Sequence, residues 1–402
     1  MVSLADIRHA QVLIAPHIIR TPLVYSPTIS AMAGAEVYLK LETLQKAGSF
    51  KVRGATFKIL SCPERCKEHG VVAASAGNHA QGVAIAAQIA GIPATIVMPE
   101  WTSIAKQEAT RGYGANVIIA GLTLEESIGQ AQVIAREGGL FIHPYDDEGV
   151  ITGQGTIALE ILQDLPDADM IVVPVGGGGL IAGIAVAAKG LRPDISIIGA
   201  QAKACPSAYE ALRHVEPVRV DAGRTIADGI RVMQTGTETL PVLRELVDTI
   251  ALVSEEEIAD AMLLLMERKH VIAEGAGATP LAALLNGSIP VRPGCKVVLV
   301  ISGGNVDSPQ LFRILRQSLI RHGRITRFSV LLDDQPGTLA RLLFTIAKER
   351  GNILAIQHIQ GESDTSAYQA RVDLEIETRG LAHADAIKKA LGDQGYRILI
   401  PR

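Results

Sequence analysis

The stretch MIVVPVGGGGLIAGIAVAA, from Met170 to Ala188, is uncharged and roughly long enough to cross a membrane. Pro174 and four successive glycines interrupt it, and both residue types break regular structure. We therefore expect a short strand, a turn and a helix instead of a membrane span. Glycines in such a turn let backbone N–H groups approach an anion at the helix N-terminus. The turn VGGGGL, Val175 to Leu180, predicts a phosphate site; the alternative is a tight turn that binds nothing.

Apolar runs of strand length alternate with helical runs on both sides of this stretch. They begin with VVAA at 71–74 and ATIVM at 94–98, and they end with KVVLVI at 296–301. Short β-rich runs between helices indicate parallel sheets covered on both faces. We expect an α/β catalytic unit with two sheets over about residues 1–322. Ser3 is a candidate helix N-cap, and Ser254 with Glu257 has the spacing of a capping box.

The pattern changes after RHGR, Arg321 to Arg324. Residues 326–402 read as strand, helix, strand, strand, helix, strand, and the first helix is expected to open at Pro336. This βαββαβ order is that of a ferredoxin-like unit, and it carries no obvious catalytic cluster. We expect a separate C-terminal domain.

The kind of phosphate follows from what surrounds the glycines. Gly177, Gly179 and Ala182 satisfy the loose dinucleotide pattern G-x-G-x-x-A, which is a weak signal alone. The next strand ends in Gln201, where a dinucleotide site would need an acidic residue for the ribose. The Gly-Lys-Ser/Thr of an ATP loop is also missing from this turn. A single phosphate monoester therefore fits better.

Three further segments carry polar groups suited to a cofactor. Ser75, Asn78 and His79 in ASAGNHAQG would meet at one helix N-terminus; the alternative is that they are an N-cap, a turn residue and an interior histidine. Ser302 in ISGGN follows a strand, where a hydroxyl can bond a ring nitrogen. Lys51 lies between two glycines in KAGSFKVRGA. A phosphate, a ring oxygen, a ring nitrogen and an amine are what pyridoxal 5'-phosphate requires of a protein.

Composition excludes other classes of partner. The net charge is -4, and no dense run of lysine and arginine predicts contact with nucleic acid or an anionic membrane. Four cysteines lack zinc-finger spacing, so we expect reduced thiols and no metal site. No signal peptide is visible at the N-terminus, which makes the cytoplasm the expected location.

The motifs together resemble the threonine ammonia-lyases, or threonine dehydratases, which are fold-type II enzymes dependent on pyridoxal phosphate. SFKVRGA, ASAGNHAQG, GQGTIALE, VPVGGGGL, TIADG and ISGGN occur in the order found in that family. The resemblance spans about residues 1–322 and implies a tryptophan synthase β-like fold with a small subdomain, about 50–145, inserted in the large one. Residues 326–402 resemble an ACT regulatory domain.

The resemblance implies a role for each motif. Lys51 would carry the cofactor as a Schiff base, beside Phe50. Asn78 would bond the ring hydroxyl, and Ser302 would face the pyridine nitrogen. The phosphate would lie on Gly176, Gly177, Gly178 and Gly179. The substrate carboxylate would be received by Ser75 and by the backbone of Asn78 and His79. TIADG, 225–229, and EGAGA, 274–278, would border the pocket in roles that the sequence does not specify.

The implied reaction is the dehydration and deamination of L-threonine to 2-oxobutanoate and ammonia, and of L-serine to pyruvate. Lys51, released when the substrate amine takes its place, would be the base for the α-proton. A neutral serine at the pyridine nitrogen favours prompt elimination over a long-lived carbanion.

Two alternatives remain open. Serine racemase shares this fold, but Ala76 stands where its second acid/base serine would be, and Gln201 where it offers a cation-binding glutamate. A non-catalytic amino-acid sensor would leave Lys51 unexplained.

Regulation and assembly are further expectations. An amino-acid effector would bind the ACT-like domain near Pro336, Gly337 and Asn352, and the family implies a homodimer or homotetramer. A domain that serves only oligomerisation is the alternative. The sequence does not decide between catabolic and biosynthetic roles, the identity or sign of an effector, or threonine and serine.

Overall fold

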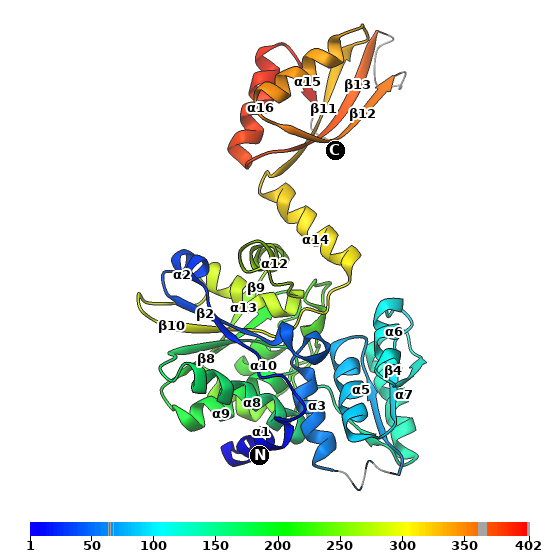
Figure 1. Cartoon of the computed structure of the whole chain (residues 1–402), viewed down its shortest axis with the longest axis vertical. Coiled ribbons are helices and arrows are strands. Elements are labelled where there is room, and N and C mark those ends of the chain that lie inside the picture. The colour runs from blue at the N-terminus through cyan, green and yellow to red at the C-terminus, as the bar shows by residue number, and fades with distance from the viewer. Residues whose placement is uncertain (63, 65, 67, 215, 361–367, 400–402) are drawn as a thin grey trace. The chain divides into compact units, whose positions relative to one another are not determined.

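The computed structural model describes residues 1–62, 64, 66, 68–214, 216–360 and 368–399 (Figure 1). The chain separates into two compact units, Met1–Asp307 and Ser308–Arg402. The second unit begins with helix α14, Ser308–Arg321, which the sequence had grouped with the catalytic unit.

A six-stranded sheet forms the larger part of the first unit. Its order is β1-β2-β10-β7-β8-β9, and every neighbouring pair is parallel except β1 with β2. The strands are β1 Leu23–Tyr25, β2 Glu36–Leu41, β7 Met170–Pro174, β8 Ser196–Ala202, β9 Thr249–Val253 and β10 Lys296–Ile301. Its helices are α1 Leu4–Ile14, α2 Pro27–Ala33, α8 Glu148–Asp164, α9 Gly179–Leu191, α10 Ser207–Arg213, α11 Thr239–Leu246, α12 Glu255–Lys269 and α13 Gly275–Leu285.

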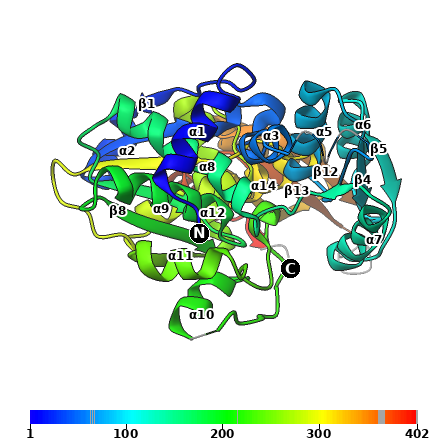
Figure 2. The ribbon, with the colours of Figure 1, turned by 90° about the horizontal axis from the view of Figure 1, so that it is seen from below.

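A second, four-stranded parallel sheet lies beside the larger one in the first unit (Figure 2). Its order is β5-β4-β3-β6, with strands β3 Val71–Ala74, β4 Ala94–Met98, β5 Asn116–Ile119 and β6 Leu140–Phe141. The accompanying helices are α3 Lys51–Leu60, α5 Asn78–Ala90, α6 Ile104–Gly112 and α7 Leu124–Arg136. The expectation of two α/β sheets is confirmed.

The stretch 170–188 folds as its glycines and proline predict. β7 ends at Pro174, α9 begins at Gly179, and Gly178 between them has a φ of 100°, which side-chain-bearing residues rarely adopt. Within the described residues, no helix is both long and apolar enough to cross a membrane.

Glycines also let three helices of the first unit pack closely against one another. A Cβ on Gly153 of α8 would come within 2.6 Å of the Gly54 Cα on α3, and one on Gly155 within 2.8 Å of the Gly183 carbonyl oxygen on α9. The GQG of GQGTIALE is therefore a packing motif that brings α3, α8 and α9 together.

Both helix starts expected from the sequence are present. Ser3 and Ser254 each accept a hydrogen bond from the third backbone N–H of their helix, and the carboxylates of Asp6 and Glu257 accept one from the backbone N–H of Ser3 and Ser254. These capping boxes fix where α1 and α12 begin.

The second unit has the expected βαββαβ order after α14. Its antiparallel sheet runs β12-β13-β11-β14, and the elements are β11 Ile325–Asp333, α15 Thr338–Lys348, β12 Asn352–Gln360, β13 Gln369–Glu377, α16 Leu381–Asp393 and β14 Arg397–Leu399. One boundary was wrong: α15 begins after Gly337, not at Pro336, because Gly337 at a φ of 89° is the N-cap.

Candidate active site

Lys51 is the first residue of α3 and its amine is held from a distant segment. The Nζ atom donates a hydrogen bond of 2.6 Å to the carbonyl oxygen of Pro144, and it lies 5.2 Å from the centre of the Phe50 ring. On its other side, Gly82 of α5 packs against the Lys51 backbone. Burial lowers the pKa of Lys51 to about 8. About a tenth of the amine is therefore neutral at pH 7, far more than for an ordinary lysine, and the neutral form is the one that acts as a nucleophile or base.

The ISGGN turn lies directly against the segment that carries Lys51. The Phe50 N–H donates to the Ser302 carbonyl oxygen over 3.1 Å, and Ser49 forms a β-bridge with Gly303. Ser302 is buried, with 2% of its surface exposed. The end of β10 and the start of α3 are thus fixed to each other, which brings two of the predicted site residues together.

Asn78 begins α5 and contacts a residue whose role the sequence left open. Its Nδ2 atom lies 2.7 and 3.0 Å from the two carboxylate oxygens of Glu274. Its Oδ1 atom is buried and has no hydrogen-bond partner in the described part of the chain. The amide is therefore held at its nitrogen end and unpaired at its oxygen end.

The side chains of Ser75 and His79 have different hydrogen-bond partners. The Ser75 hydroxyl accepts from the Gly77 N–H, and Gly77 is the N-cap of α5, so Ser75 is not itself the N-cap. The His79 Nε2 lies 2.9 Å from the carbonyl oxygen of Ile142 and must donate to it. Burial, with Lys51 nearby, lowers the pKa of His79 to about 3, so the ring is neutral. The His79 side chain is an interior histidine, whereas its backbone N–H lies in the first turn of α5.

The glycine turn offers the hydrogen-bond donors of an anion site. The backbone N–H groups of Gly176, Gly177, Gly178 and Gly179 donate to no acceptor among the described residues. Three of these glycines are buried, where an unpaired N–H is costly. Successive free donors at the start of α9 form a suitable place for a phosphate.

Residues 143–146, between β6 and α8, hold this turn in place, and the sequence did not identify them. A Cβ on Gly177 would lie 2.2 Å from the Tyr145 ring. Asp146 accepts from the backbone N–H groups of Thr237, Glu238 and Thr239 at 2.8 to 3.3 Å. The Thr239 hydroxyl in turn donates to the Gly177 carbonyl oxygen. Since Pro144 holds the Lys51 amine, one short segment contacts both the lysine and the glycine turn.

A buried ion cluster lies two residues beyond Lys51 on α3. The Arg53 guanidinium pairs with Glu42 at 2.8 Å and with Glu160 at 2.7 Å. Lys40 also contacts Glu160, and all four side chains are at least 95% buried. Burial disfavours the Arg53 charge, but the two carboxylates raise the pKa of Arg53 above its usual value. Arg53 in SFKVRGA and Glu160 in GQGTIALE both belong to motifs noted in the sequence, but their pairing was not expected.

The residues predicted to bind an effector are not part of the first unit. Pro336, Gly337 and Asn352 belong to the second unit, where Asn352 donates to Glu377 on the neighbouring strand. Gln201 is buried and accepts from the Tyr209 N–H, so it stabilises the start of α10.

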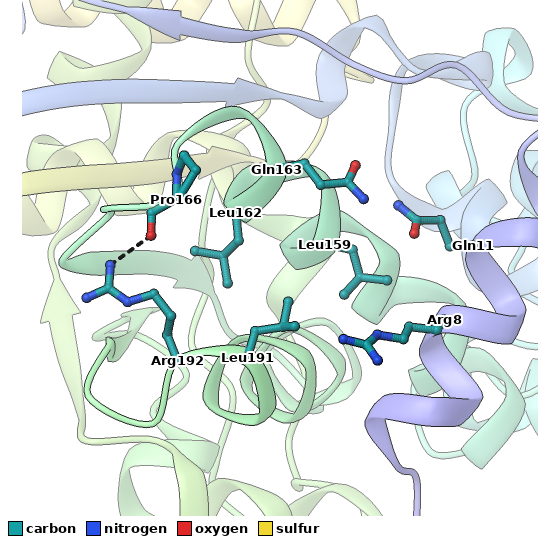
Figure 3. A pocket seen from close by; sticks show the side chains of 8 residues that line it. All are labelled: Arg8, Gln11, Leu159, Leu162, Gln163, Pro166, Leu191 and Arg192. Carbon is teal, nitrogen blue, oxygen red and sulfur yellow. Dashed lines mark hydrogen bonds between the residues drawn. The ribbon is translucent and has the colours of Figure 1, made fainter.

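A pocket of about 300 Å³ opens elsewhere in the first unit, over α1, α8 and α9 (Figure 3). Its lining includes Arg8, Leu159, Leu191 and Arg192, and Arg192 donates to the Pro166 carbonyl oxygen. No predicted site residue lines it.

Comparison with known proteins gives consistent matches. The family model of the pyridoxal-phosphate dependent enzymes matches residues 14–303. The chain is 45% identical over 401 residues to the L-threonine ammonia-lyase of Thermotoga maritima, with 100% of both chains covered. Among solved structures, the threonine deaminase from T.th. matches with a TM-score of 0.71 and 42% identity, covering 76% of this chain and 99% of that one. Maize serine racemase matches with a TM-score of 0.75 and 37% identity, covering 80% of this chain and 99% of that one.

Proposed function

This chain belongs to the pyridoxal-phosphate dependent enzymes and, within them, to the L-threonine ammonia-lyases, and on this premise we propose that it releases 2-oxobutanoate and ammonia from L-threonine at a cofactor site built around Lys51. The observation that carries this proposal is the 45% sequence identity to a threonine ammonia-lyase over the full length of both chains. L-Serine, which would give pyruvate, is the expected second substrate.

The residues present fit pyridoxal phosphate. The unpaired N–H groups of residues 176–179 suit its phosphate, and the unpaired Oδ1 of Asn78 suits its ring hydroxyl. Ser302, held beside Phe50, suits the pyridine nitrogen. When bound, the cofactor supplies an electron sink that makes the α-proton of an amino acid removable.

The protein's own groups then bind the substrate and move its protons. The free N–H groups in the first turn of α5, with the Ser75 hydroxyl, receive the substrate carboxylate. The Lys51 amine, with its pKa lowered to about 8, takes the α-proton. Ser302 is neutral, so it would hold the pyridine nitrogen without favouring its protonation.

Serine racemase activity has less support. An L-threonine ammonia-lyase matches this chain over its full length at 45% identity, whereas maize serine racemase matches 80% of it at 37% identity. Ala76 also offers no hydroxyl for returning a proton from the face opposite Lys51. A sensor without chemistry would not need a lysine whose pKa is lowered.

The test is release of 2-oxo acid from L-threonine by the purified, cofactor-loaded chain and by a Lys51→Ala variant. We expect rapid release by the first and none by the second. A yellow protein that acts on neither threonine nor serine would refute the dehydratase proposal, and a colourless one would refute the cofactor site.

We further propose that the second unit binds an amino-acid effector at the turn between β11 and α15. Gly337 there has no side chain to keep an effector from the backbone. Titration of isoleucine, valine, serine and threonine should shift the rate curve of the wild-type chain and not that of a Gly337→Ala variant. Identical curves for both would refute the effector site.

We also propose a homo-oligomeric assembly and a cytoplasmic location. β12 is an edge strand whose residues are mostly exposed, including Leu354 and Ile356, which supports association into a homodimer or homotetramer. Light scattering of the full chain would measure its mass. A cytoplasmic location rests on the sequence alone, and cell fractionation would test it.

A further inference from the structure

Glu274 is a buried carboxylate that the proposed reaction does not use. It precedes α13 as the N-cap residue, and only 4% of its surface is exposed. Its side chain makes no capping hydrogen bond to its own helix. Instead, both carboxylate oxygens accept from the Asn78 amide nitrogen, while the Glu274 backbone N–H donates to Gly303. The side chain therefore serves Asn78 and not the helix that it begins.

Two glycines border this carboxylate, and one of them is too close to it to be replaced. A Cβ on Gly303 would lie 2.6 Å from Glu274 Oε1, and one on Gly229 would lie 3.4 Å from it. These glycines belong to ISGGN and TIADG, two motifs that border the candidate site. Larger residues at Gly303 would push the carboxylate away from Asn78.

Asn78 shows what the arrangement leaves for a ligand. An amide can present either its N–H₂ or its oxygen to a neighbour, and an ionised carboxylate accepts only from the N–H₂ end. With Nδ2 held by Glu274, the buried Oδ1 remains unpaired within the described residues. A buried acceptor without a partner calls for a donor, and a pyridine-ring hydroxyl can be one.

We propose that Glu274 is a positioning residue for the cofactor: its ionised carboxylate holds the Asn78 nitrogen and so presents the Asn78 oxygen to the ring hydroxyl. The inference rests on the proposed function, because it assigns Asn78 to the cofactor ring. Protonation of Glu274 releases this constraint, since a carboxylic acid can donate to the amide oxygen and let the amide reverse.

The charges around Glu274 place this change in an accessible pH range. Burial raises its pKa to about 7, and Asp228 adds to the rise. Asn78, Lys106 and Lys51 act in the opposite direction. Glu274 is thus mainly protonated below about pH 7 and ionised above it.

The experiment compares visible absorbance spectra of cofactor-loaded wild-type and Glu274→Gln protein. Visible absorbance of a pyridoxal chromophore depends on whether its ring hydroxyl is protonated. Spectra are recorded at about pH 6 and about pH 8.5, on either side of the Glu274 pKa of about 7. We expect them to differ at the higher pH and to converge at the lower. Glu257→Gln, which removes a negative charge from the α12 capping box, should match wild type at both.

Substitution of two neighbouring charged residues should shift the pH midpoint of the spectral change. A purely structural role for Glu274 predicts no such shift. Asp228→Asn should shift the wild-type spectral midpoint to lower pH, and Lys106→Met should shift it to higher pH. Glu274→Ala, which removes the hydrogen bond as well, should weaken cofactor binding about tenfold in equilibrium dialysis.

Superimposable spectra of yellow wild-type and Glu274→Gln protein at both pH values would overturn the inference while leaving the proposed function intact. A difference of equal size at both pH values would also overturn it, because the ionised form would not be the one that acts. Absence of colour in the wild type would refute the proposed function instead.

Discussion

Lys51 and Arg53 lie two residues apart on one helix, are both cationic, and have opposite surroundings. The Lys51 amine donates to a backbone carbonyl, and burial lowers its pKa to about 8. Arg53 is enclosed by two carboxylates that raise its pKa. A buried cation paired with carboxylates stays charged and holds the structure, whereas one without them can lose its proton and react. Since both of these side chains are buried, the carboxylate partners of Arg53 are what separates it from Lys51.

Removing Arg53 should give the largest effect on stability. Arg53→Met leaves Glu42 and Glu160 without their main partner, so we expect a loss of about 3–5 kcal/mol in the free energy of unfolding. Urea unfolding of the full chain measures it. Lys51→Met is the matched control, and it should cost far less because it removes no paired charge. Equal losses in the two variants would break the comparison.

Asp146 tests whether the glycine turn depends on the segment that holds Lys51. Asp146→Ala leaves three N–H groups at 237–239 without an acceptor, and we expect the dissociation constant of pyridoxal phosphate to rise about tenfold or more. Equilibrium dialysis provides the measurement. Asp147→Ala removes the adjacent carboxylate, which caps α8, and should change cofactor binding much less.

The pH dependence of Lys51 sharpens the contrast further. A lysine whose pKa falls from 10.5 to about 8 is neutral above about pH 8, and only the neutral amine attacks an aldehyde. Uptake of pyridoxal phosphate by cofactor-free protein should therefore rise about tenfold per pH unit below pH 8 and level off above it. Stopped-flow absorbance follows the uptake. A rise that continues toward pH 10 would indicate an ordinary lysine.

An exposed ion pair should give the smallest effect. Glu375 accepts from Arg316 and Arg327 in the second unit, but both arginines are about a third or more exposed. We expect Arg316→Ala to cost under about 1 kcal/mol because solvent screens such pairs. Urea unfolding measures this loss. A loss near that of Arg53→Met would show that pairing alone, without burial, determines the contribution of an ion pair to the free energy of unfolding.

The elements of the first unit follow from local sequence, whereas the partners of its charges do not. The strand and helix around the glycine turn are expected from Pro174 and the glycines, and the α12 capping box from Ser254 and Glu257. Glu274 contacts Asn78 across 196 positions, and Glu160 contacts Arg53 across 107. Such pairings depend on which elements the fold makes neighbours, so spacing in the chain cannot show them.

The start of α15 was missed for a different reason. Proline often occupies the first turn of a helix, so Pro336 was the expected start. The positive φ of Gly337 makes it the cap instead, and sequence alone does not distinguish the two registers.

The segment 143–146 connects β6 to α8, and surface connections of this kind usually tolerate insertions and deletions. Here three consecutive residues make three different contacts. Pro144 accepts from the lysine amine, Tyr145 packs against the glycine turn, and Asp146 accepts from the backbone at 237–239. Adding or deleting a single residue would shift all three at once. This connection should therefore be as intolerant of length changes as a core strand, although it has no regular secondary structure.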